Sequence, residues 1–187
     1  MTAGEAEWLV QIRSKLRRGN RVLFAKDNAL FAELNDALAA ASRKAAVLWA
    51  LELAAAAVGT LAERYPGEER PAAALDASRA WAAGRVKMRE ARRAILDCHG
   101  FAKQIASPED AALCHAVGQA CGTVHANGHA IGFPVYELTA MVHRLGIENC
   151  QGAVEQRVAH YRRRLDYWSD HYGDHRGGWA RFLEAGS

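Results

Sequence analysis

Hydrophobic and polar residues follow one another along most of this chain with the spacing of amphipathic helices. Apolar positions recur every three or four residues, in long stretches rich in Ala, Leu, Arg and Glu. No segment alternates convincingly with the two-residue period of a half-buried strand, and the chain has only four prolines. The pattern therefore predicts an all-α protein, folded as a single-domain bundle of about seven to eight helices.

Glycine, proline and capping residues divide this pattern into individual helices. The clearest start is Ser107-Pro108-Glu109-Asp110, which offers a hydroxyl cap, a proline at the first helical position and acids in the first turn. Near Ser42 the break is less evident, and the third helix either continues the second or follows a kink. We expect helices at about 6–18, 27–40, 42–64, 71–84, 87–106, 108–127, 133–145, 151–172 and 179–185.

The third of these helices is apolar nearly all round from Ala45 to Val58, which is typical of a central, buried helix. The apolar run is too short to span a bilayer, so we expect no membrane partner. Glu52 lies in its middle and needs a partner, because an unpaired buried carboxylate is costly. We expect an ion pair with an arginine such as Arg79 or Arg92; a catalytic or ligand-binding acid is the alternative.

The length and charge of the chain limit its organisation and its partners. With 187 residues and 20.4 kDa it suits one domain, with N-terminal helices over 1–41 packed on a core over 42–172 and a tail with a short helix over 173–187. A net charge of +3 is only mildly basic, and acids interrupt most of the arginine clusters. We therefore expect solvated helix faces, and a nucleic-acid partner is disfavoured.

The four cysteines indicate a compartment. Cys98, Cys114, Cys121 and Cys150 form no CxxC pair, and the start of the chain lacks the basic and apolar regions of a signal peptide. Free thiols in a reducing cytoplasm are the better interpretation.

The histidines are the main candidates for chemistry. His125 and His129 are four residues apart and share one face if the sixth helix is intact there, a spacing that suits a metal. However, the segment lacks the Glu of the HExxH pattern, so no metal-activated water is indicated. His115 points to nearly the same side but lies about 21 Å from His129 along a straight helix, too far to share an ion.

Two Cys-His dipeptides lie almost symmetrically about the turn at Ser107. A helical hairpin there brings Cys98-His99 level with Cys114-His115, and two cysteines and two histidines are zinc ligands in kind. Neighbouring side chains on a helix point about 100° apart, so both members of a pair rarely face one site. We therefore favour buried packing, with imidazoles hydrogen-bonded across the hairpin, over zinc.

No recognised enzyme motif is present. The chain has no GxSxG elbow, no Cys-His-Asn context and no glycine-rich phosphate loop after a strand, so we predict neither catalysis nor a cofactor. The C-terminal helix is rich in residues that dominate protein-binding surfaces, and we expect Arg162, Arg163, Tyr167 and Trp168 to contact a partner.

A series of motifs from Leu48 to Tyr136 resembles a known bacterial family. They are LWALE at 48–52, ERYP at 63–66, RP at 70–71, RAWAAGRVKMREARRA at 79–94, His99, and HAVGQACGTVHANGHAIG at 115–132. Together they resemble the helical immunity proteins of bacterial polymorphic toxin systems. The resemblance implies a cytoplasmic, non-enzymatic protein that binds a cognate protein toxin and blocks it stoichiometrically.

Two other functions remain open at this level. A metal-binding helical protein or enzyme would use His99, His115, His125 and His129, with Glu52 nearby. A nucleic-acid-associated protein would use the arginine clusters and would lose affinity steeply with salt. The oligomeric state also remains open, a homodimer included.

Overall fold

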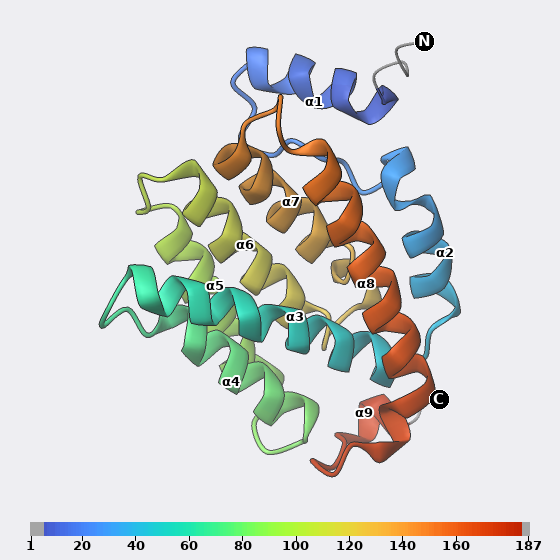
Figure 1. The fold of residues 1–187 in the computed structure, drawn as a ribbon. Helices are drawn as coiled ribbons and strands as arrows, with labels where there is room; N and C mark the ends of the chain where they lie inside the picture. The colour runs from blue at the N-terminus through green and yellow to red at the C-terminus, as the bar shows by residue number, and fades with distance from the viewer. Residues whose placement is uncertain (1–5, 185–187) are drawn as a thin grey trace.

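The computed structural model describes residues 6–184, and these form helices and turns without any strand (Figure 1). The all-α prediction is confirmed. The helices are α1 (Glu7–Arg17), η1 (Ala29–Phe31), α2 (Ala32–Ala40), α3 (Arg43–Arg64), α4 (Arg70–Ala82), α5 (Met88–Ala102), α6 (Pro108–Gly122), η2 (Asn127–His129), α7 (Gly132–Leu145), α8 (Gln151–His171), η3 (Tyr172–Asp174) and α9 (Arg181–Glu184).

Helices α3 and α6 form the centre of the bundle. α6 packs against α3, α4, α5 and α7, and α3 packs against α4, α6 and α8. In Figure 1, α6, α7 and α8 lie in one slanting layer, and α3 crosses them with α4 beside it, while α5 packs against α4 and α6. The many buried alanines of α3 and α6 permit this close approach.

Helix α3 is central because nearly all of its faces are covered. Its buried residues include Val47, Trp49, Leu53 and Leu61, and the Ser42 side chain caps its start by accepting a hydrogen bond from Ala45 N. By length and composition α3 alone among the described helices is apolar enough to cross a bilayer. Packed between α4, α6 and α8, it has the composition that a core helix needs.

Three predicted helices differ from the observed ones by four or five residues at one end, and of these the fifth ends at Ala102 rather than near Ala106. The second begins later than expected, since a 3-10 turn capped by the Asn28 side chain precedes α2. The sixth ends at Gly122 rather than near Asn127, because the segment Thr123–Gly128 has poor helix formers and the turn-forming Asn127-Gly128 pair. Residue 185 of the predicted last helix lies outside the described residues.

The ERYP motif ties α3 to the start of α6. Arg64 forms ion pairs with Glu109 and Asp110, and the Tyr65 hydroxyl donates to Asp110 Oδ2 at 2.9 Å. The two acids in the first turn of α6 thus pair with Arg64, and their negative charge also stabilises the positive end of the helix dipole. This motif is explained by packing and charge within the fold.

A second polar network, which the sequence did not indicate, ties α7 to α8. Arg157 donates two hydrogen bonds to Glu137, at 2.8 and 2.7 Å, and the Tyr161 hydroxyl donates to the same carboxylate. Trp49 Nε1 on α3 in turn donates to the Tyr161 backbone oxygen at 2.9 Å. These bonds fix α8 against the core and so fix the side chains that α8 presents.

Candidate functional site

The residues predicted as one functional cluster are divided between two sites. Glu52 and Arg79 line a cavity between α3, α4 and α8. Arg92, His99, His125 and His129 line a cleft between α5, α6 and η2, which we call the imidazole cleft. His115 lines neither site and instead hydrogen-bonds His99.

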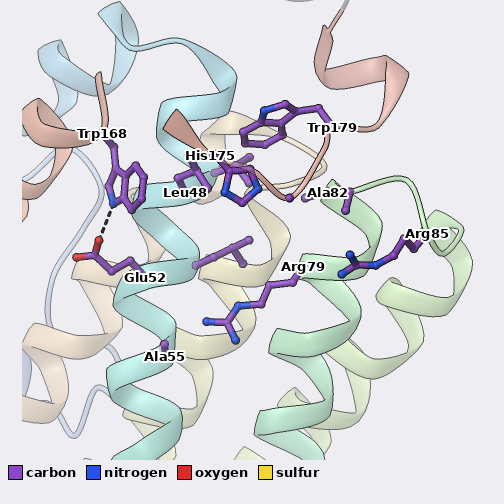
Figure 2. A pocket seen from close by; sticks show the side chains of 13 residues that line it. Leu48, Glu52, Ala55, Arg79, Ala82, Arg85, Trp168, His175 and Trp179 are labelled. Atoms are coloured by element: carbon purple, nitrogen blue, oxygen red, sulfur yellow. Dashed lines mark hydrogen bonds between the residues drawn. The ribbon is translucent and has the colours of Figure 1, made fainter. Parts of the chain in front are cut away.

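The first site, which we call the arginine–tryptophan cavity, has a volume of about 430 Å³. α3 provides its apolar floor, α4 and the following turn provide two arginines, and α8 and the C-terminal segment provide two tryptophans (Figure 2). Its lining residues are Val47, Leu48, Leu51, Glu52, Ala55, Arg79, Ala82, Ala83, Arg85, Trp168, His175, Gly177 and Trp179.

Glu52 is bound within the protein at one end of this cavity. Arg164 donates two hydrogen bonds to it, at 2.6 and 2.7 Å, and Trp168 Nε1 donates a third at 2.6 Å. The expected arginine pair is therefore present, but the expectation of Arg79 or Arg92 as its partner was wrong. Helix α5, which carries Arg92, packs against α4 and α6, whereas α4 and α8 both pack against α3, and the side chain that reaches Glu52 comes from α8.

The environment of Glu52 keeps it ionised. Burial on its own raises the pKa of the carboxyl, but the hydrogen bonds from Arg164 and Trp168 and the positive charge of Arg164 outweigh burial and lower it. A catalytic acid or base would need a pKa nearer neutrality and a free lone pair facing substrate. Glu52 therefore suits a structural role that holds Trp168 at the cavity edge.

The two arginines of the cavity are held differently. Among residues 6–184, the one ion-pair contact of Arg79, on α4, is a long one of 3.7 Å with the exposed Asp76. Arg85 follows the helix end at Gly84, whose φ of +73° allows Arg85 N to bond Ala80 O in a tight C-terminal turn. Arg85 forms no ion pair with any residue among 6–184. Figure 2 shows both guanidinium groups directed into the cavity.

The C-terminal segment covers the cavity on another side. We call residues 172–184 the C-terminal strap. Ala180 N donates to Ala82 O at 2.7 Å, and the Ala180 Cα lies 3.4 Å from where a Cβ on Gly84 would stand. The Lys44 ammonium lies 5.8 Å from the Trp179 ring centre, and His175 lies against the same indole. These contacts place both aromatic groups over the cavity.

The imidazole cleft is of similar size, about 450 Å³, and its rings are packed against α6. A Cβ on Gly118 would stand 2.4 Å from the nearest His99 ring atom, and one on Gly122 would stand 3.2 Å from the His129 ring. His129 Nδ1 lies 3.2 Å from Gln119 Oε1. Gly118 is therefore required for the His99 ring to lie where it does, whereas a Cβ at Gly122 would displace the His129 ring by only a few tenths of an ångström.

His125 and His129 do not share a helical face, so that expectation was wrong. α6 ends before both of them, and His129 belongs to η2. His125 is exposed and stacks on Trp81 with ring centres 6.1 Å apart. Arg92 is the only side chain with a permanent positive charge in the cleft, and Met88 and Leu96 are its exposed apolar members.

His99 and His115 bond across the hairpin of α5 and α6, as the sequence predicted. Their Nδ1 atoms are 2.9 Å apart, so one ring donates and the other accepts, which requires at least one neutral ring. Burial, followed by the positive charge of His115, Lys103 and His129, lowers the pKa of His99 to about 4. Burial also lowers the pKa of His115.

The hairpin separates the thiols from the imidazoles. Cys98 and Cys114 are fully buried with their Sγ atoms 3.6 Å apart, whereas both rings are only half-buried. Hydrogen bonding with Cys114, followed by burial, raises the pKa of the Cys98 thiol, which disfavours the thiolate that a metal needs. Within residues 6–184 no three His, Cys, Asp or Glu side chains converge closely enough to hold a metal.

Of the four residues expected to contact a partner, only Trp168 lines the arginine–tryptophan cavity. Arg162 pairs with Asp166 at 2.9 Å along the outer face of α8, and Arg163 is exposed. Tyr167 is exposed and stacks on His171.

Sequence reasoning did not single out Arg85, Arg164, His175 or Trp179 as members of one site. The available signal was the glycines: Gly84 ends α4 beside Arg85, and Gly177-Gly178 bends the strap between His175 and Trp179.

Comparison with known proteins identifies the central part of the chain. A family model described as Imm-5 like putative immunity protein matches residues 36–164, more than half of the chain. The match is wider than the motifs at 48–136 and includes both Glu52 and Arg164, whereas Trp168 and the C-terminal strap lie beyond it. No curated protein and no solved structure matches the chain.

Proposed function

The chain belongs to the Imm-5 like immunity protein family, and on that basis we propose that it binds a cognate bacterial protein toxin and neutralises it. The mechanism is stoichiometric: a rigid helical surface covers the part of the toxin that its activity needs. Family membership is the observation that carries this proposal.

The geometry of the polar groups supports binding over catalysis. Glu52 is engaged by Arg164 and Trp168, and His99 is engaged by His115. Neither pair offers a nucleophile with an adjacent base, which is the arrangement that covalent catalysis uses. The free cysteines are all buried, which accords with a cytoplasmic location where thiols stay reduced.

A titration distinguishes a stoichiometric inhibitor from an enzyme. The purified chain is added in increasing amounts to a fixed amount of the toxin encoded beside its gene, and residual toxin activity is measured. A tight inhibitor gives a straight decline that reaches zero at a fixed molar ratio, because each chain removes one toxin. Gel filtration of the mixture shows the complex directly.

Two outcomes would reject the proposal. A chain that forms no complex with any neighbouring gene product does not act by binding. Neutralisation by far fewer chains than toxin molecules, continuing with time, would instead identify an enzyme that turns over.

A further inference from the structure

The arginine–tryptophan cavity has the size and lining of a binding site, and contacts within the fold do not account for these features. Its size, about 430 Å³, falls in the range of about 300–1,000 Å³ that suits a bound group. The floor from α3 is apolar, and two indoles stand at its edges (Figure 2). Tryptophan and arginine around a concave apolar surface are the usual composition of a binding hot spot.

The charged side chains of the cavity determine whether its occupant is an anion or a cation. Glu52 is the only carboxylate among its lining residues, and Arg164 compensates that charge. Arg79 has only the long contact with exposed Asp76, and Arg85 has no ion pair with any described residue. Burial lowers the pKa of His175, so its ring adds no positive charge at neutral pH. Two guanidinium groups therefore remain for an anion.

The positions of these groups also orient the occupant. Figure 2 places Arg79 and Arg85 on the α4 side, and Glu52 with Trp168 on the opposite side. A carboxylate is attracted to the first side and repelled from the second, while an apolar or aromatic group fits over the α3 floor beside Trp168. The matching chemistry is an acidic residue beside a bulky apolar one.

We infer that this cavity is the anchor site for the toxin, and that it takes an acidic segment whose bulky apolar side chain lies over the α3 floor beside Trp168 while its carboxylates bind Arg79 and Arg85. The inference rests on the proposed function. The cavity is smaller than a whole interface, since stable complexes bury about 800 Å² per partner, so neighbouring surface completes the contact.

A charge-reversal experiment tests this assignment. The double variant Arg79→Glu/Arg85→Glu is compared with the control Arg89→Glu/Arg93→Glu, which makes the same charge change at two exposed arginines of α5 that line neither site. We expect the first to weaken binding of the neighbouring toxin about 30-fold or more, as hot-spot residues do. The control should stay within about threefold of the unmodified chain, as rim charges do. Circular dichroism verifies that both variants remain helical.

The unmodified chain provides a second measurement. Amide hydrogen exchange of the C-terminal strap, at residues 175–180, should slow when the toxin binds. Unchanged exchange there, or equal binding by both double variants, would overturn the assignment while leaving the immunity function intact. Failure of the unmodified chain to bind any toxin would reject the function itself.

The same variants test for a different occupant. If the free chain were a dimer on gel filtration and Arg79→Glu/Arg85→Glu made it monomeric, a second copy of the chain would cover the cavity. That result would overturn an acidic toxin segment as its occupant.

Discussion

The arginine–tryptophan cavity and the imidazole cleft are nearly equal in volume but differ in how their polar groups are used. In the cleft, His99 bonds His115, His129 lies against Gln119, and His125 stacks on Trp81. In the cavity, Arg164 and Trp168 bind Glu52 and His175 lies against Trp179, but two guanidinium groups are left for solvent or a partner.

This difference shows that residue type alone is a poor guide to a binding site. Histidines are the commoner candidates for chemistry, yet here they hold helices together. Arginines usually lie on solvent-exposed helix faces, yet Arg79 and Arg85 both line a cavity with an apolar floor. What distinguishes the two sites is that the imidazoles of the cleft have partners within the protein, whereas neither guanidinium group of the cavity has an ion pair shorter than 3.7 Å with a described residue.

The largest expected effect is on the packing of the cleft. The substitution Gly118→Ala places a Cβ 2.4 Å from the His99 ring. The ring must therefore move, which disturbs its hydrogen bond to His115. We expect a loss of about 2–3 kcal/mol in the free energy of unfolding, as overpacked core sites show. Urea denaturation followed by circular dichroism measures it.

Gly59→Ala is the matched control, because Gly59 is also within a helix but a Cβ there meets nothing within 4 Å. It should stabilise the chain by about 0.5–1 kcal/mol through helix propensity. If Gly118→Ala were equally stabilising, the rings of the cleft would not be packed against α6 as described.

The second effect concerns pH and the buried imidazole pair beside the cleft. The pKa of His99 is about 4 in the folded chain against 6.5 as its ordinary value, so the unfolded state binds this proton first. The contribution of this group to the free energy of unfolding should therefore fall, by on the order of 2 kcal/mol, as pH drops from about 6.5 towards 4. Below the folded pKa this contribution changes no further.

Urea denaturation at a series of pH values tests the assignment. The variant His99→Gln should flatten the decline between pH 6.5 and 4, whereas His171→Gln, an exposed ring on α8, should leave it as it is. An unchanged slope in His99→Gln would mean that the buried imidazole pair does not set the acid sensitivity.

The helices could be predicted because their signals are local. Ser107 caps α6 as expected, and the apolar run from Ala45 to Val58 lies at the centre of the bundle. At Ser42, where the sequence left the break open, the side chain caps α3 and α2 ends at Ala40. The end of α6 was missed because its last predicted turn relied on spacing, whereas Asn127-Gly128 favours a turn. Local residue chemistry decided the boundary.

The sites could be predicted only in part, because they depend on which helices meet. The bond between His99 and His115 followed from one short hairpin. The partner of Glu52 is Arg164, a residue more than one hundred positions away, and no local pattern selects it over Arg79. The cavity likewise needs the C-terminal strap to return to α4 at Ala82.

The smallest effect tests the claim that Glu52 positions Trp168 and does no chemistry. Glu52→Gln keeps the shape but removes the charge that binds Arg164, and both side chains are about one-third exposed. We expect a loss of only about 1 kcal/mol at pH 7, because water screens such a pair. The pKa of Glu52 is lowered in the folded chain, so its stabilisation is present above the ordinary value of 4.5 and disappears as pH falls through the lower folded pKa. The free energies of unfolding of the unmodified chain and the variant should therefore differ at pH 7 and converge in acid.

Asp166→Asn, which breaks the exposed pair with Arg162, is the control and should change the free energy of unfolding by less than about 0.5 kcal/mol at any pH. A variant that kept full stability but lost all toxin neutralisation would show instead that Glu52 contacts the toxin. The carboxylate of the cavity, as well as its two arginines, would then be part of the interface.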